Sequence, residues 1–148
     1  MLIEILKNMF SRDLNKLKTE IESYKNEAIL WEVDTNISNS AGNLCLHLIG
    51  NLNAFVGAEL GKSGYVRQRE LEFSTKNVPR EELIKKIAET LLVVISTLDN
   101  LTEEDLKKDF PLKVFENKTS TEFFLIHLIT HLSYHLGQIN YHRRLLEK

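Results

Sequence analysis

Apolar residues recur at steps of three and four along four separate segments of this chain, and this is the period of an amphipathic α-helix. Charged residues fill most of the positions between them. The clearest apolar stripe lies between residue 2 and about residue 24: Ile3, Leu6, Phe10, Leu14, Leu17 and Ile21. The 148 residues include only six glycines and two prolines, which are too few for the many turns of an all-β chain. The pattern therefore predicts an all-α fold.

Three further helices are expected downstream of this stripe. The second carries Leu44, His47 and Phe55 at helical spacing and runs to about Leu60. Glycine at position 61 and again at position 64 should stop it, because glycine disfavours the helix interior. Three residues before this segment are suited to cap its N-terminus: Ser38, Asn39 and Ser40.

The last two expected helices begin at recognisable start signals. Pro79 fits the first turn of the third helix, whose apolar stripe ends at Leu98. Thr119-x-x-Glu122 reads as a capping box that opens the fourth helix, which runs to Leu146. The connectors between the helices are residues 26–39, 61–78 and 99–118. Four amphipathic helices with no credible strand predict a four-helix bundle that forms a single domain over residues 1–148.

Charge and composition exclude several classes of function. The net charge is −2 and basic residues are interleaved with acidic ones, so the chain lacks the basic stripe of a nucleic-acid-binding protein. No apolar run is long enough to cross a bilayer, and the first residues do not resemble a signal peptide. We therefore expect a cytoplasmic protein with no nucleic-acid and no membrane partner. Cys45 is the only cysteine, which excludes an intrachain disulfide and a cysteine metal cluster.

Four of the five histidines lie in the last expected helix, at spacings of four, four and seven residues. At about 100° per residue, their side chains fall within an arc of roughly 80°. Two imidazoles one helical turn apart can bind one metal ion, and zinc or nickel suits such ligands. A third ligand must come from another helix, and His47, among apolar residues of the second helix, is the candidate. Three protein ligands would leave a coordination position open for water or substrate.

The other two histidines of the last helix are less suited to this site. His127 could replace one ligand of the pair, support a ligand from behind or face solvent, and we favour a position outside the ligand set. His142 lies roughly 10 Å further along the helix axis than His135, too far to share one ion with the others. We expect His142 to lie on the surface.

Two segments carry a resemblance to a known family. They are Ser40-Ala-Gly-Asn-Leu-Cys-Leu-His47-Leu-Ile-Gly-Asn51-Leu and His131-Leu-Ser-Tyr-His135-Leu-Gly137-Gln138-Ile139. One histidine in the second helix and His-x-x-x-His-x-Gly-Gln-Ile in the fourth resemble the DinB/YfiT-like superfamily. The resemblance covers nearly the whole chain. It implies a four-helix bundle that holds a divalent metal through His47, His131 and His135. Some relatives are metal-dependent transferases that use a thiol such as bacillithiol or mycothiol.

Several other residues are candidates for a pocket beside the metal. Asn51 lies one turn from His47 and could bind a substrate or water, or pack against another helix. Gln138 could contact the site or a partner subunit. Arg67 and Arg69, with Glu70, could border the pocket in the connector 61–78, where arginines would suit an acidic substrate or the carboxylate of a thiol cofactor. Ordinary surface ion pairs are the alternative.

These observations support two classes of function. The first is a metal-dependent thiol transferase acting on a small electrophilic compound, with a low-molecular-weight thiol as co-substrate and a homodimer as the expected assembly. Metal-dependent hydrolysis is a related possibility, although no carboxylate general base is evident beside the histidines. The second is a metal-binding or stress-response protein without turnover.

Overall fold

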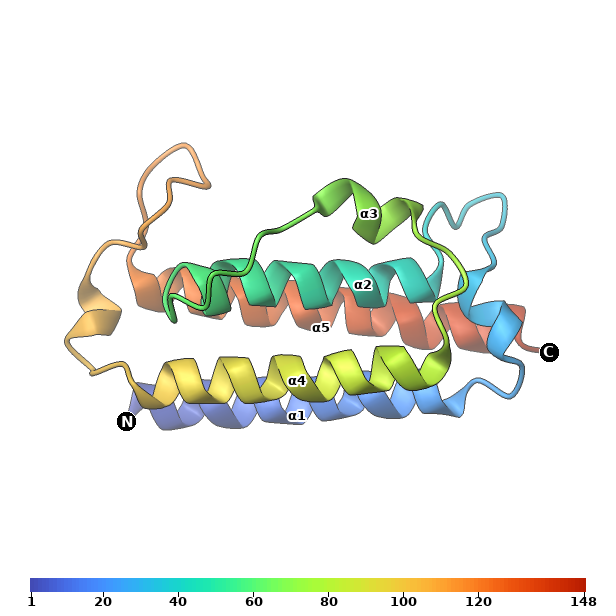
Figure 1. Ribbon diagram of the computed structural model, residues 1–148, viewed down its shortest axis with the longest axis horizontal. Helices are drawn as coiled ribbons and strands as arrows, with labels where there is room; N and C mark the ends of the chain where they lie inside the picture. The colour runs from blue at the N-terminus through green and yellow to red at the C-terminus, as the bar shows by residue number, and fades with distance from the viewer.

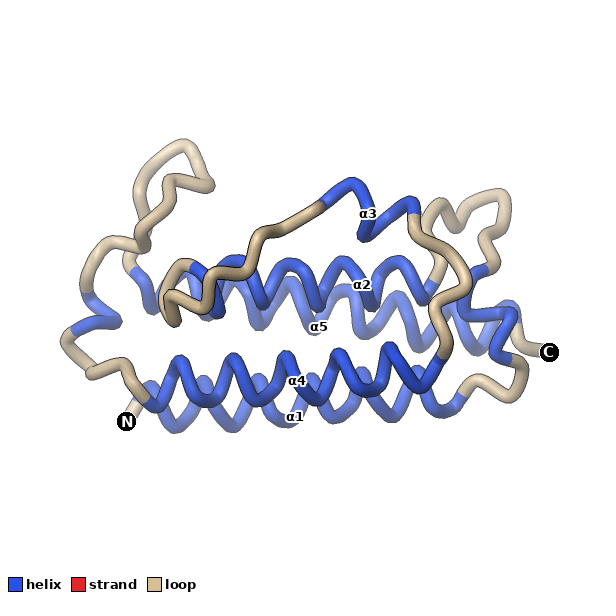
Figure 2. Tube along the Cα trace, in the orientation of Figure 1, coloured by secondary structure: helices blue, strands red, loops and turns tan.

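The computed structural model describes residues 1–148 and is all-helical, as the apolar periodicity predicts (Figures 1 and 2). The five α-helices are α1 Leu2–Ser23, α2 Ala41–Leu52, α3 Arg69–Ser74, α4 Arg80–Asp99 and α5 Thr121–Leu146. Short 3-10 turns lie at Glu27–Trp31 and Asp105–Lys107, and a π-helical segment, Asn53–Ala58, continues α2. No sheet forms, and the only β-type pairs are two isolated bridges. None of the helices combines the length and the apolar character needed to span a bilayer.

The four long helices run along the longest dimension of the molecule (Figure 1). Helix α1 packs against α4 and α5, and α2 packs against α5 and α4. The short helix α3 crosses over the outer side of α2, and the two chain termini lie at opposite ends. One contiguous cluster of buried apolar side chains fills the interior. It includes the α1 stripe from Leu6 to Ile21, and burial of this stripe is the main force that fixes α1.

One predicted helix start is confirmed and two differ in detail. Helix α4 begins at Arg80, so Pro79 is its N-cap and not part of its first turn. Ser40 caps α2, since its hydroxyl accepts a hydrogen bond from the Asn43 backbone N–H at 3.1 Å. The α5 cap is Ser120 and not Thr119, because the Ser120 hydroxyl accepts from the Phe123 N–H at 3.2 Å. The Thr119 carbonyl accepts a hydrogen bond from the Phe110 N–H at 2.9 Å, and this bond closes the loop before α5.

The second expected helix reaches about Leu60, but in two forms. Helix α2 ends at Leu52, and the six residues Asn53–Ala58 follow in a π-helical conformation, which often marks functional sites. Gly57 faces α4 so closely that a Cβ there would lie 2.9 Å from Val93 Cγ1. This glycine therefore serves helix packing. The connector 61–78, expected as a loop, contains the one and a half turns of α3.

Candidate metal centre

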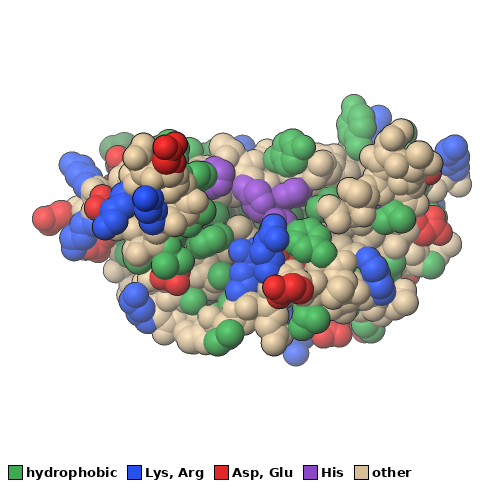
Figure 3. Space-filling view, turned by 90° about the horizontal axis from the view of Figure 1, so that it is seen from above, with side chains coloured by type: hydrophobic (Ala, Val, Ile, Leu, Met, Phe, Trp, Pro, Cys, Tyr) green, Lys and Arg blue, Asp and Glu red, His purple; other side chains and the backbone are tan.

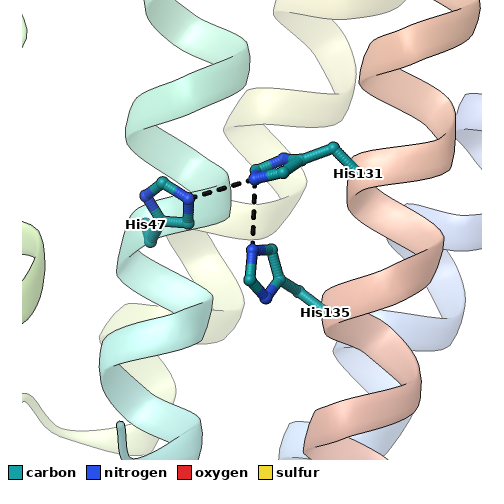
Figure 4. Close-up of side chains that lie close together, drawn as sticks. All are labelled: His47, His131 and His135. Atoms are coloured by element: carbon teal, nitrogen blue, oxygen red, sulfur yellow. Dashed lines mark hydrogen bonds between the residues drawn. The ribbon is translucent and has the colours of Figure 1, made fainter.

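Three histidines from two helices meet at the surface where α2 packs against α5. Helix α2 contributes His47, and α5 contributes His131 and His135, and all three rings point toward one another (Figure 4). The Nε2 atom of His131 lies 3.2 Å from that of His47 and 3.1 Å from that of His135. The ligand atoms of the three residues all lie within 4.8 Å of one another, close enough to hold one metal ion.

The outer nitrogens of two of these rings are hydrogen-bonded, and this fixes their tautomers. His47 Nδ1 lies 3.0 Å from Glu72 Oε1, and His135 Nδ1 lies 2.7 Å from Gln138 Oε1. A carboxylate oxygen and an amide oxygen only accept, so each Nδ1 carries the proton and each Nε2 presents a lone pair. A neutral His131 has one N–H and can donate a hydrogen bond to the Nε2 of His47 or to that of His135, but not to both. The protein alone therefore leaves converging lone pairs unsatisfied.

Two of the separations between the ligand nitrogens match those of a tetrahedral metal site. Metal–nitrogen bonds of about 2.0–2.1 Å hold two ligand nitrogens roughly 3.3–3.4 Å apart at tetrahedral angles. The observed separations of 3.1 and 3.2 Å are close to that value. In addition, the buried Nδ1 of His131 has no hydrogen-bond partner. No protein group therefore fixes the tautomer of this ring, and its Nε2 is free to present a lone pair to a metal. Three imidazoles on one side leave room for a further ligand.

Glu72 on α3 holds the His47 ring in place through its Nδ1, a role that no sequence pattern predicted. Its carboxylate accepts bidentate hydrogen bonds from Arg67, Nε at 2.9 Å and Nη2 at 3.0 Å. The side chain is only 6% exposed. It occupies the space left by Gly50, where a Cβ would overlap the carboxylate. Glu70 was the predicted acidic residue in this loop, but on α3 it is exposed to solvent, and Glu72 packs against α2 instead.

The electrostatics keep these groups in the protonation states that metal binding needs. Burial, and then the neighbouring His135 and His47, lower the pKa of His131 to about 4. Burial also lowers the pKa of His135, despite an opposing hydrogen bond to Gln138. Burial acts to raise the pKa of Glu72, but the hydrogen bonds from His47 and Arg67 outweigh it, and the pKa is lowered. Near pH 7 the site thus holds neutral imidazoles at His131 and His135 and an ionised carboxylate at Glu72.

A pocket of about 250 Å³ adjoins His47 and His131. Four of the residues predicted to border the site line it: Asn51, Arg67, Arg69 and His127. Gln138 lies outside it and contacts the site only through His135. His127 is not among the three converging histidines, and its ring stands edge-on to Phe115 with 4.8 Å between ring centroids.

His142 is not on the surface, and the prediction for this residue was wrong. Its side chain is only 3% exposed. Nδ1 lies 2.7 Å from the Tyr24 hydroxyl, and Nε2 lies 2.8 Å from the Glu32 carbonyl oxygen. The helical register places it on the inner side of α5, where the connector after α1 covers it. The apolar period of α5 gives no information about this covering segment, so it could not predict that His142 is buried.

Comparison with known proteins gives a family and a fold. A family described as "Protein of unknown function (DUF1572)" matches residues 2–148. Among solved structures, the crystal structure of a conserved protein from Enterococcus faecalis is similar, with a TM-score of 0.76. The alignment covers 97% of this chain and 96% of that one at 17% identity, and a likeness at this identity concerns the fold alone. No curated protein matches the chain.

Proposed function

We propose a function for this chain, which belongs to the DUF1572 family of proteins of unknown function. It is a divalent-metal protein that transfers a low-molecular-weight thiol to a small electrophilic compound. The proposal assigns the metal, zinc or nickel, to His47, His131 and His135. It also assigns the helical fold to the four-helix bundles of the DinB/YfiT-like superfamily, which the histidine motifs resemble.

One observation carries the proposal: the Nε2 atoms of the three histidines converge. At most one of the two short contacts between them can be a hydrogen bond, because His131 has one proton to donate. Two of the lone pairs are held in place by Glu72 and Gln138 through the opposite ring nitrogens. Such outer partners are a regular feature of protein metal sites, because they fix the tautomer and the ring orientation of the ligand. Without a further partner, at least one of the converging Nε2 lone pairs lacks a donor.

The surroundings of the site suit a transfer reaction. A divalent cation held by neutral imidazoles would lower the pKa of a bound thiol and so favour the nucleophilic thiolate. The chain itself supplies Arg69, an arginine with no carboxylate partner, at the adjoining pocket, where it can attract an anionic co-substrate. The pocket offers space beside the histidines for the electrophile. This adjoining space favours an enzyme over a metal-binding protein without turnover.

Glu72 argues against the hydrolytic alternative. A carboxylate does lie beside His47, in contrast to the expectation from sequence, but both of its oxygens are engaged. Oε1 accepts from His47 and Arg67, and Oε2 accepts from Arg67. Together with the lowered pKa, this makes Glu72 a group that positions His47 and not a base that takes a proton from water.

The experiment that tests this function uses protein loaded with nickel or zinc. Thiols such as cysteine, glutathione and bacillithiol are added to the nickel form, and sulfur-to-nickel charge-transfer absorption is recorded. Consumption of a chromogenic electrophile by the zinc and nickel forms is then followed with each thiol. We expect absorption and turnover in the parent protein and neither in His131→Ala. A metal-loaded parent protein that binds no thiol and consumes no electrophile would contradict the transferase.

We also propose that the protein acts in the cytoplasm as a homodimer, on small molecules and not on nucleic acid. In support of self-association, α5 exposes apolar side chains that fall within an arc of about 100° on the helical wheel. They are Phe123, Ile126, Tyr134, Tyr141 and Leu145. Sedimentation equilibrium tests the assembly, and a monomer across the micromolar range would remove the homodimer.

A further inference from the structure

The walls of the pocket beside His47 and His131 combine polar and charged side chains with apolar ones, some of them aromatic. Phe55 and Phe124 meet there edge to face, with 5.1 Å between ring centroids and 68° between the ring planes. The apolar lining residues are Phe55, Val114, Phe124 and Leu128. The volume of about 250 Å³ lies just below the usual range for ligand pockets, roughly 300–1,000 Å³. The space therefore suits a compound built on a single ring.

Asn51 provides an unused hydrogen-bond acceptor in this pocket. The residue is 7% exposed, lies one helical turn from His47, and lines the pocket. Its buried Oδ1 has no hydrogen-bond partner. A buried acceptor without a donor costs free energy, about 1–3 kcal/mol. A ligand with a hydroxyl or amino group would remove this cost.

Arg69 provides an unpaired positive charge at the same pocket. Arg67 is neutralised by its two hydrogen bonds to Glu72 and also lies over the Phe55 ring. Arg69 is exposed, rests over the Phe73 ring at 5.3 Å from the centroid, and pairs with no carboxylate. No acidic residue lines the pocket. Figure 3 shows Lys or Arg side chains directly beside the histidines on this face, with hydrophobic side chains next to both.

We infer that the pocket binds a small aromatic carboxylate that also carries a hydrogen-bond donor. The ring would pack against Phe55 and Phe124, the carboxylate would pair with Arg69, and the donor would reach Asn51 Oδ1. That this compound is the substrate presented to the metal rests on the proposed function. Its binding to the pocket does not, because none of these contacts involves the metal.

The test measures binding of 3-hydroxybenzoate to chelator-treated, metal-free protein by calorimetry, with amide shifts by NMR to locate the site. Metal is removed so that the carboxylate cannot ligate it. We expect binding with shifts at Asn51, Phe55 and Phe124, and much weaker binding of 3-hydroxybenzyl alcohol, which lacks the charge, and of acetate, which lacks the ring. Equal binding of all three probes, or no shifts in the pocket, would overturn the inference.

Arg69 and Arg144 provide a test variant and a matched control for the role of the positive charge at the pocket. Arg69→Gln should weaken binding of 3-hydroxybenzoate about fivefold or more, and Arg69→Lys should restore part of it. Arg144 is also exposed and lies over an aromatic ring, Tyr141, at 5.1 Å, but away from the pocket. Arg144→Gln should leave binding unchanged. An equal effect of the two Gln variants would contradict the role of Arg69.

Asn51→Leu tests the hydrogen bond without removing bulk. The parent protein should bind 3-hydroxybenzoate more tightly than benzoate by about three- to tenfold. In the variant the ratio should fall to about one, while benzoate still binds. If the variant keeps the parent's preference for 3-hydroxybenzoate over benzoate, the assignment to Asn51 is overturned. If this buried variant fails to fold, the Arg69 variants still decide the inference. Carboxylate binding without metal uptake would defeat the proposed function alone, whereas metal uptake without carboxylate binding would defeat only this inference.

Discussion

Helix α5 carries two imidazole sites that differ in how the protein satisfies them. His142 has a partner at each ring nitrogen: the Tyr24 hydroxyl at 2.7 Å and the Glu32 carbonyl at 2.8 Å. His131, eleven residues earlier, has a buried Nδ1 with no partner and an Nε2 that faces two other imidazoles. One site is complete within the protein, and the other is not.

The protonation pattern explains the difference. A carbonyl oxygen only accepts, so His142 Nε2 carries the proton and Nδ1 accepts from the Tyr24 hydroxyl, whose pKa is raised by burial. The same hydroxyl also lies 3.2 Å from the Ile139 carbonyl oxygen, the longer of its two contacts. Both ring nitrogens of His142 thus have a partner, and these contacts tie α5 to α1 and to the connector after it. At His47, His131 and His135 the lone pairs converge instead. A complete site stabilises the fold, whereas the converging nitrogens of the incomplete one are close enough to hold a metal ion.

The largest expected effect separates the two sites by metal content. The parent protein should bind one equivalent of zinc or nickel per chain, and His131→Ala should bind none, because it loses a central ligand. His142→Ala should still bind one equivalent. Inductively coupled plasma mass spectrometry on tag-free protein measures all three. Equal metal content in the two variants would abolish the distinction between the sites.

The next effect concerns stability without metal. His142→Ala should lower the free energy of unfolding by about 2–4 kcal/mol, since it leaves the Tyr24 hydroxyl and the Glu32 carbonyl unsatisfied and opens a cavity. His131→Ala in metal-free protein should cost less, because that ring makes few favourable contacts to lose. Urea denaturation followed by circular dichroism gives both values. A larger loss for His131→Ala would reverse the comparison.

A smaller effect is expected from the groups that hold His47. Glu72→Gln should weaken metal affinity about 10- to 100-fold, because the carboxylate no longer fixes the imidazole. Gly50→Ala should act similarly, since its Cβ displaces Glu72. Gly137→Ala is the control: nothing lies within 4 Å of a Cβ there, so affinity should hold and stability should rise by about 0.5–1 kcal/mol. Competition with a chromogenic chelator measures the affinities. Unchanged affinity in Glu72→Gln would show that His47 needs no such support.

The smallest effect is on pH dependence. His131 has an ordinary pKa of 6.5 in the unfolded chain and about 4 in the folded protein. As pH falls from about 6.5 to 4, the unfolded chain binds a proton that the folded protein does not, so metal-free stability should decrease over this window and stay level just above it. His131→Leu should flatten the slope. Denaturation midpoints at several pH values, with NMR titration of the imidazoles, test this. A His131 titrating near 6.5 would contradict it.

Much of the fold was predictable because its signals are local. The apolar period placed α1, α4 and α5 within a few residues of their observed bounds, and Ser40 was among the predicted caps. The register of α5 also predicted that His131 and His135 share one side. The missed features depend on contacts across the fold. Helix α3 is too short for a period to be recognised, and it is held by side-chain contacts to α2, such as Asn43 Nδ2 donating to the Glu72 carbonyl at 2.9 Å.

The sequence by itself determined which residues could form helices and which sides of them were apolar, because helix formation follows from neighbours three and four positions away. Only the tertiary structure decided that His47 lies opposite His131 and His135, that Glu72 fills the space left by Gly50, and that His142 is buried. These outcomes depend on which side chains meet across α1, α2, α3 and α5. A ring nitrogen becomes a fixed hydrogen-bond partner or a free lone pair according to the atom that the rest of the fold places in front of it.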